Sequence, residues 1–161
     1  MTSTEFRSDH GDLTMQEMAD RLAIRELVDA YAHCADRRDV EGQISLFTAD
    51  AEFLVYMDSR NPKPSQEIRG REALRPVFEN LRTYEATTHF NGQSTVIWDQ
   101  DAAEGISYCL AHHVKVEGSS RRIMIASIRY LDQFAKVQRR WCFRRRKLMV
   151  DWIDDRPLGS G

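Results

Sequence analysis

The chain has 161 residues, a length that suits one domain built around one hydrophobic core. Hydrophobic residues make up 42% of it and charged residues 30%, which is ordinary for a globular protein. The net charge of −2 creates no overall electrostatic field that would attract the chain to nucleic acid or to an anionic membrane. The apolar runs of the sequence are short, so no membrane-spanning helix is predicted.

The N-terminal segment is polar and lacks the apolar core of a signal peptide, so we expect a flexible tail over residues 1–14. Cys34, Cys109 and Cys142 are odd in number and widely spaced, without a Cys-x-x-Cys motif. This pattern indicates neither a disulfide framework nor a zinc site. The expected compartment is therefore the reducing cytoplasm.

Three helices are predicted in the first half of the chain. Residues 15–36 place apolar side chains at helical spacing and predict an amphipathic helix. Asp39 is a favourable N-cap for a second, shorter helix that is expected to run through Phe47. A third helix is predicted over residues 71–84, directly after Gly70.

Strands are predicted around and after these helices. Residues 51–57 alternate as a strand, and a stretch with two prolines, residues 58–66, breaks it. Four long strands joined by short turns then follow, over residues 87–98, 106–116, 122–134 and 141–153. This order predicts an antiparallel meander in an α+β fold, with the helices covering one face of a curved sheet. Such a sheet encloses a cone whose mouth suits a small molecule, and we expect one domain over residues 15–153 with a C-terminal tail over 154–161.

Alternation along the strand at 106–116 separates two faces. The small, mildly polar side chains of one face are Ser107, Cys109, Ala111 and His113. They leave a hollow, whereas the bulky side chains of the other face are expected to pack. We therefore expect His113, and not His112, to face a cavity. The alternative is that both are surface or interface histidines.

Asp36 lies at the end of the first predicted helix, at the edge of its apolar stripe. Carboxylates are rarely buried without a partner, and the helix dipole disfavours one near the C-terminus, so we expect an imidazole N–H to compensate. The alternatives are a solvated helix end or an ion pair with Arg37 or Arg38. Asp29 and His33 form a rival pair at helical spacing, in a segment typical of a surface face.

His89 interrupts its strand and could be a packed residue, a metal ligand or a base. A carboxylate that accepts a hydrogen bond from one imidazole nitrogen leaves the other nitrogen as a proton acceptor of fixed orientation. Paired with Asp36, His89 would be a general base that needs no cofactor, and His113 could donate to a carbonyl oxygen or protonate a leaving hydroxyl. Two histidines and a carboxylate could also hold a metal, but no local His-x-Asp/Glu element occurs, so we expect none.

Other chemistry is less favoured. The sequence contains no Gly-x-Ser-x-Gly elbow and no phosphate-binding glycine pattern, and Cys109 has no activating neighbour. Tyr56 ends its strand and could bind a substrate oxygen, or be a core tyrosine with its hydroxyl at the rim. Within the basic run at 144–147, Arg146 shares its parity along the strand with Leu148, Val150 and Trp152 and is expected to turn inward, while the other charges form a solvated face.

The order of these elements resembles the SnoaL-like branch of the nuclear transport factor 2-like superfamily, which consists of cone-shaped α+β folds. The resemblance covers about residues 15–153. The segments AYAHCADRRDVEGQISLFTADAEF and WCFRRRKLMVDW look like the opening helices and the closing strand of that branch. Within it, the sequence is most similar to the scytalone dehydratases and next to the hexachlorocyclohexane dehydrochlorinases, which use an Asp–His dyad without a cofactor.

The resemblance places that dyad on Asp36 and His89. The second histidine of the dehydratases, eight residues after a glycine, falls on His113 because the glycine matches Gly105. The pocket tyrosine falls on Tyr56.

The resemblance also marks positions on the later strands and at the end of the first helix, and at some of them this sequence differs from the two enzyme groups. The dehydrochlorinase arginine of the last strand falls on Arg146. A serine and an asparagine of the dehydratase pocket fall near Ile128 and Tyr130, and Ala35 replaces a tyrosine. These departures imply a different substrate, for which we expect Tyr130 to be a contact beside the residues that match.

The sequence thus predicts a cofactor-independent lyase, or a related isomerase or cyclase, that acts on a small, mostly apolar carbonyl-containing or ring substrate. The alternative is a non-catalytic protein that binds a small molecule. We also expect a homo-oligomer, because residues of the outer face of the sheet such as Tyr108, Leu110 and Trp152 would expose apolar surface to solvent in a monomer. The two enzyme groups imply a trimer, and the wider superfamily implies a dimer.

Overall fold

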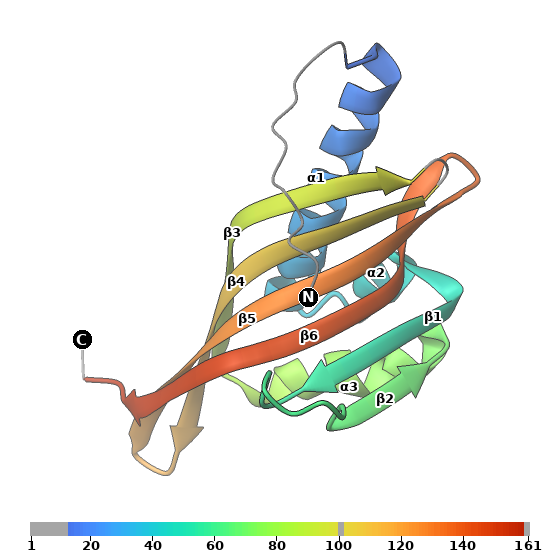
Figure 1. The fold of residues 1–161 in the computed structure, drawn as a ribbon. Coiled ribbons are helices and arrows are strands. Elements are labelled where there is room, and N and C mark those ends of the chain that lie inside the picture. Colours follow the sequence, from blue (N-terminus) through green and yellow to red (C-terminus); the bar gives the residue numbers. More distant parts are fainter. Residues whose placement is uncertain (1–12, 100–101, 160–161) are drawn as a thin grey trace.

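The computed structural model describes residues 13–99 and 102–159 (Figure 1). The helices are α1 (Met15–Arg37), α2 (Val40–Ser45), the 3-10 helix η1 (Arg71–Leu74), α3 (Arg75–Glu79) and the 3-10 helix η2 (Asn80–Thr83). The strands are β1 (Phe47–Tyr56), β2 (Gln66–Arg69), β3 (Ala86–Asp99), β4 (Ala102–Glu117), β5 (Ser120–Val137) and β6 (Arg140–Pro157). None of the helices in the described ranges combines the length and the hydropathy that crossing a membrane requires.

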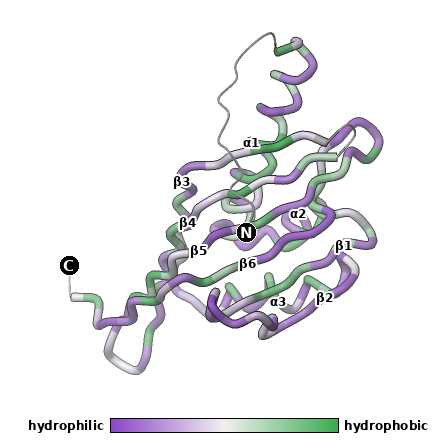
Figure 2. Tube along the Cα trace, viewed as in Figure 1, coloured by the Kyte–Doolittle hydropathy of each residue, from purple (hydrophilic) through white to green (hydrophobic). Residues whose placement is uncertain are grey.

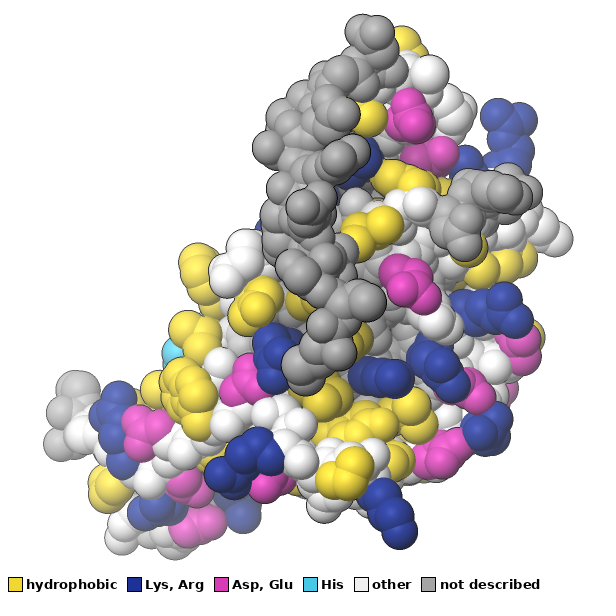
Figure 3. All heavy atoms as spheres, viewed as in Figure 1, with side chains coloured by type: hydrophobic (Ala, Val, Ile, Leu, Met, Phe, Trp, Pro, Cys, Tyr) yellow, Lys and Arg dark blue, Asp and Glu magenta, His cyan; other side chains and the backbone are white. Residues whose placement is uncertain are grey.

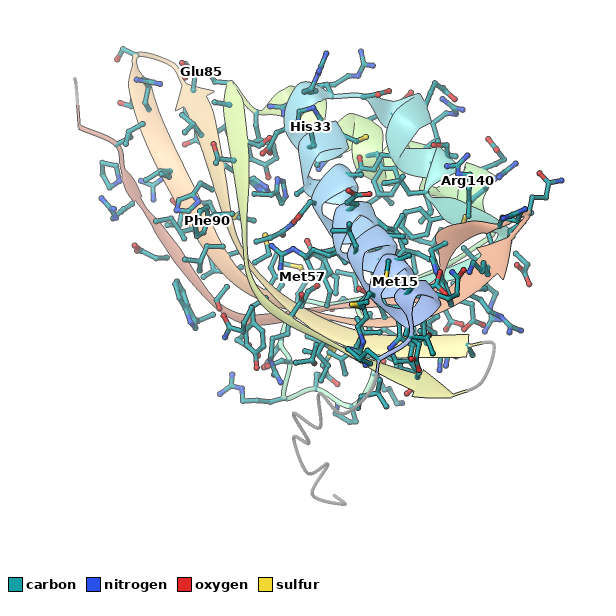
Figure 4. All side chains as sticks on the ribbon, turned by 90° about the horizontal axis from the view of Figure 1, so that it is seen from above. Met15, His33, Met57, Glu85, Phe90 and Arg140 are labelled. Carbon is teal, nitrogen blue, oxygen red and sulfur yellow. The ribbon has the colours of Figure 1, made fainter. Side chains whose placement is uncertain are left out.

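The strands form one six-stranded sheet in the order β2-β1-β6-β5-β4-β3. The β3–β4–β5–β6 meander is antiparallel, β2 pairs antiparallel with β1, and β1 joins the meander through a parallel pairing with β6. The sheet curves around α1, which lies in its concave side (Figure 4). The predicted α+β class, with a curved sheet covered on one face by helices, is confirmed.

Local signals set the ends of α1. Thr14 and Glu17 form a capping box, in which each side chain accepts a hydrogen bond from the backbone N–H of the other. The helix ends at Arg37 and is capped by Arg38, whose φ of 60° is left-handed and whose backbone N–H donates to the carbonyl oxygens of Cys34 and Ala35. One stripe of the helix is buried against the sheet, consisting of Ile24, Leu27, Val28, Tyr31, Ala32 and Ala35.

Several elements differ from their predicted bounds. The short α2 ends at Ser45, because Phe47 already begins β1 and is buried opposite Phe143 of β6. The third helix is divided into η1, α3 and η2. Pro76 separates η1 from α3, because it lies in the first turn of α3 and cannot donate the hydrogen bond that would continue η1. The strand β2 was not predicted, since it has only four residues and follows a proline-rich loop.

The long strands alternate between a buried and a solvent-exposed face. Hydrophobic and hydrophilic residues are interleaved along them (Figure 2). On the concave side, the core includes the rings of Tyr31, Phe47, Phe53, Phe78 and Phe143, which contact one another mainly edge to face. The last strand runs to Pro157, beyond residue 153 where the domain was expected to end, because residues 154–157 pair with the first residues of β5.

Candidate active site

A cavity of about 260 Å³ lies between the helices and the concave face of the sheet. Its walls are mostly apolar or aromatic and include Phe53, Val55, Phe78, Ile128, Leu148 and Val150. Two histidines, His89 and His113, contribute polar atoms to the same cavity. No aspartate, glutamate, lysine or arginine of the described residues lines it. The cavity therefore suits an uncharged, largely apolar molecule.

A larger groove, of about 810 Å³, is open to solvent between α1 and the turn that joins β5 to β6. Asp20, Lys136 and Trp141 line it, and the Asp20 carboxylate accepts hydrogen bonds from the other two side chains. None of the predicted site residues lies in this groove. The smaller cavity is the candidate active site because it contains the imidazoles.

Asp36 and His89 meet at the wall of the cavity. The carboxylate of Asp36, in the last turn of α1, accepts a hydrogen bond of 2.7 Å at Oδ1 from Nδ1 of His89 on β3. Its second oxygen, Oδ2, accepts the backbone N–H of His89 at 2.9 Å. The His89 side chain is only 7% exposed and that of Asp36 is 27% exposed, so the imidazole is shielded from water while the carboxylate stays partly accessible. Because Nδ1 carries the proton toward the carboxylate, Nε2 is left as an acceptor.

The environment of Asp36 favours its charged form. Burial raises the pKa of the Asp36 carboxyl, but the hydrogen bonds from the side chain and backbone of His89 and from the Thr87 hydroxyl outweigh burial, so the pKa is lower than usual. Asp36 is consequently a carboxylate at neutral pH. A carboxylate in this position stabilises a positive charge on His89 when that ring takes up a proton.

His113 lies across from His89, with 5.4 Å between the ring centroids. Neither ring nitrogen has a hydrogen-bond partner among the described residues, and the ring of Tyr84 packs against it at 4.7 Å. Burial lowers the pKa of His113 to about 4, with a further contribution from His89. The imidazole is therefore neutral at pH 7 and has one N–H that a bound molecule can accept. His112, on the other face of β4, does not line the cavity.

The tyrosines occupy different positions. Tyr130 lines the cavity with only 3% of its surface exposed, and Tyr31 of α1 lies beside it. Tyr56 does not line the cavity, so its expected contact with a substrate there is wrong. Phe53 and Val55 fill this wall instead, and alternation along β1 turns Tyr56 to the opposite face.

Arg146 turns inward, as strand alternation predicts, but it does not line the cavity. Its guanidinium donates two hydrogen bonds of 2.8 Å to the fully buried Asp132. It also lies 4.2 and 4.0 Å from the ring centroids of Tyr31 and Tyr130. The expected direct contact with substrate is therefore wrong, because a buried guanidinium needs a carboxylate partner and Asp132 supplies one.

Contacts in the structure decide between Asp36 with His89 and the other side-chain groupings that the sequence left open. Asp29 accepts hydrogen bonds from Arg25 and Asn91, whereas His33 contacts Arg37, so the rival pair of Asp29 and His33 does not form. In the described part of the chain, no three side chains of histidine, cysteine, aspartate or glutamate are grouped so that they could hold a metal ion.

Thr87 and Arg38, which hold the Asp36 carboxylate, were not predicted from the sequence. Thr87 donates to Asp36 from the same face of β3 as His89, and strand alternation could have identified it. Arg38 donates to Thr87 through a left-handed turn that no sequence pattern announces.

The chain is similar to several known proteins. A family model described as a SnoaL-like domain matches residues 16–147. An uncharacterized protein of Mycobacterium tuberculosis is 28% identical over 143 residues, which cover 86% of this chain and 90% of the relative. These matches span almost all of the described domain.

Two solved structures extend the comparison. A protein of Novosphingobium aromaticivorans provisionally named a scytalone dehydratase has a TM-score of 0.75 and 24% identity, covering 92% of this chain and 95% of its own. A hexachlorocyclohexane dehydrochlorinase has a TM-score of 0.70 and 20% identity, covering 89% and 91%. At these identities the likeness shows a shared fold.

Proposed function

The chain belongs to the SnoaL-like domain family, and on this premise we propose that it is a cofactor-independent lyase or isomerase acting on a small, mostly apolar carbonyl-containing substrate. The observation that carries the proposal is the hydrogen bond of 2.7 Å between Asp36 and His89 at the wall of an apolar cavity. It prepares Nε2 of His89 to accept a proton inside that cavity. Similarity in fold to a dehydrochlorinase and to a provisionally named dehydratase supports the same class of reaction.

In the proposed reaction, Nε2 of His89 removes a proton from the carbon next to the substrate carbonyl. The electron pair of the broken C–H bond passes into an enolate, and Asp36 stabilises the imidazolium that forms. His113, which is neutral, donates its N–H to the enolate oxygen.

The enolate then has two outcomes. In an elimination, the enolate expels a hydroxyl from the β-carbon, and the proton that His89 removed from the α-carbon is passed to this hydroxyl, so that it leaves as water. In an isomerisation or a cyclisation, the electron pair forms a new bond within the substrate, and His89 returns its proton to a carbon or oxygen atom. In both cases His89 ends the cycle neutral.

The cavity supports an uncharged substrate. Burial raises the pKa of the Tyr31 hydroxyl to about 12 and that of Tyr130 well above its ordinary value, so both hydroxyls stay protonated. They can donate to a substrate oxygen, whereas an anionic substrate would find no lysine or arginine along the described walls. Tyr130 is therefore retained as a proposed substrate contact.

The experiment is turnover of a panel of β-hydroxy ketones on one- and two-ring scaffolds by Asp36→Asn and His89→Gln. Loss of the general base should lower kcat by roughly 10²–10⁴-fold. His33→Gln is the matched control, because His33 is an exposed histidine of α1 outside the cavity, and its rate should equal that of the wild type. Rates unchanged in the dyad variants would contradict the proposal. Ligand-induced stabilisation without turnover would instead indicate a binding protein.

We also propose that the protein forms a homo-oligomer through the outer face of its sheet. Phe90, Leu110, Ser127 and Trp152 are successive cross-strand neighbours on β3, β4, β5 and β6, and they form a row across this face. Phe90 is 67% exposed and Trp152 52%. Hydrophobic side chains on this side of the molecule lie among charged ones (Figure 3). Such a surface is typical of a contact between subunits.

A further inference from the structure

The dyad rests on a second layer of hydrogen bonds that begins at Thr87. This residue precedes His89 by two positions on β3 and is buried, with 8% of its surface exposed. Its hydroxyl oxygen lies 3.0 Å from Oδ1 of Asp36, the oxygen that also receives the proton of His89. The same hydroxyl oxygen lies 2.6 Å from Nη1 of Arg38.

The direction of these hydrogen bonds follows from the groups involved. A guanidinium can only donate, so the Thr87 hydroxyl accepts from Arg38. A hydroxyl has a single proton, and the Thr87 proton is therefore available for the carboxylate. The resulting chain runs from Arg38 through Thr87 to Asp36, and it supplies the carboxylate with a third donor beside the two of His89.

The backbone conformation of Arg38 brings its side chain into this chain. Because φ of Arg38 is 60°, the polypeptide reverses at the end of α1, and Nη1 also donates to the carbonyl oxygens of Ala35 at 3.1 Å and Asp36 at 3.0 Å. These are carbonyls of the last helical turn, where a positive charge is favourable. Nη2 reaches the carbonyl oxygen of Tyr84, just before β3, at 3.4 Å.

We propose that Thr87 and Arg38 are positioning residues that fix the direction of the Asp36 carboxylate, so that Oδ1 faces Nδ1 of His89 and Oδ2 faces its backbone N–H. This inference rests on the proposed function only for its effect on turnover. Four ionisable groups surround the carboxylate: Arg38 from the end of α1, His89 from β3, and Cys109 and His113 from β4. Of these, only Arg38 acts on Asp36 through Thr87.

The test uses Thr87→Val, which keeps the shape of the side chain and removes the hydroxyl, and Thr87→Ser, which keeps the hydroxyl. Thr88→Val is the matched control, because Thr88 is an exposed residue on the opposite face of the same strand. The first measurement follows the carboxyl carbon of Asp36 by NMR in the full chain as the pH is lowered. Thr87→Val should move the protonation midpoint to higher pH, because one donor to the charged form is lost.

The second measurement is the pH dependence of kcat and KM with the substrate found by the panel above. Thr87→Val should lower kcat about tenfold with little change in KM, since a displaced carboxylate misdirects the base without removing a substrate contact. Thr87→Ser should restore both the midpoint and kcat, and Thr88→Val should leave both unchanged.

A further pair of variants keeps the test decisive where Thr87→Val folds poorly. Arg38→Met retains the Thr87 hydroxyl but removes its donor, and should also raise the midpoint of Asp36, whereas Arg37→Met, at an exposed neighbour, should not. An unchanged midpoint in both Thr87→Val and Arg38→Met, or an equal shift in the controls, overturns the inference. A shifted midpoint in a protein that turns over no substrate would support the positioning role and contradict the proposed enzyme.

Discussion

The buried ion pair of Asp132 and Arg146 leads to a strong prediction about stability. Asp132→Asn keeps the size of the side chain but removes its charge, and it leaves a guanidinium that is 0% exposed without a counter-ion. Two unit charges about 4 Å apart interact by roughly 4 kcal/mol at an effective dielectric constant of about 20, and breaking a buried pair costs about 3–5 kcal/mol. Since domains are stable by only about 5–15 kcal/mol, this change removes a large share of the total.

The assay is urea unfolding followed by tryptophan fluorescence, with the free energy of unfolding taken from the midpoint and slope. Asp151→Asn is the matched control, because Asp151 pairs with Arg129 on the outer face, where both side chains are partly exposed, 26% and 37%. An ion pair in that setting contributes at most about 1 kcal/mol. The double variant Asp132→Leu with Arg146→Met should regain most of the stability that Asp132→Asn loses, because it leaves no buried charge.

Two results would refute this reasoning. Asp132→Asn could cost no more than Asp151→Asn, which would mean that the aromatic rings around the guanidinium suffice to hold its charge. Alternatively, the double variant could be less stable than Asp132→Asn alone. Packing around these residues, and not the unpaired charge, would then dominate the free energy of unfolding.

Three further predictions follow from other parts of the structure. The pKa of Asp36 is lower in the folded chain than in the unfolded chain, so its charged form stabilises the fold above the unfolded pKa, and this contribution is lost as the pH falls through the folded pKa. The difference in the free energy of unfolding between wild type and Asp36→Asn should therefore vanish in acid. Urea titrations at several pH values measure it. Gly105→Ala should lower the free energy of unfolding by about 1–3 kcal/mol in the same assay, because the added Cβ would lie 2.9 Å from both a ring carbon of Phe134 and a backbone carbonyl oxygen. Gly92→Ala is the control and should leave it unchanged, because a Cβ at Gly92 has an ordinary nearest contact of 3.7 Å. Trp152→Glu should dissociate the proposed oligomer in sedimentation velocity experiments; an unchanged sedimentation coefficient would contradict the assigned interface.

Strand alternation was the most informative sequence signal for the site. Along β4 it separated His113 from His112, because one face carries small side chains and the other carries large ones. The same argument could not decide which face of β1 lines the cavity, because both faces carry large apolar residues and Tyr56 is compatible with either of them. Nor could it bring Asp36 to His89, since that contact joins a helix end to a strand. The pair was suggested instead by the need of a helix-end carboxylate for an N–H donor and by the family resemblance.

The partner of Arg146 could not be predicted for a different reason. Asp132 and Arg146 lie directly opposite each other on β5 and β6 because the register shifts between Gln133 and Phe134. Without this irregularity, counting from the turn would place Asp132 opposite Arg145. A bulge of this kind depends on tertiary packing and leaves no dependable mark in the sequence. Alternation therefore predicted the inward direction of Arg146, but not that a carboxylate would neutralise it.

The parallel pairing of β1 with β6 has a consequence for biosynthesis. β1, which forms one wall of the cavity, is the first strand of the sheet along the chain, whereas its hydrogen-bonding neighbour β6 is the last, so β1 leaves the ribosome well before β6. Until that strand is available, β1 can pair only with the four-residue β2, and its apolar residues have no sheet to join. Contacts between such distant segments form late and slowly. The cavity wall that β1 contributes can therefore close only after β6 has been translated, and shortening β6 at its start would remove residues with which β1 pairs.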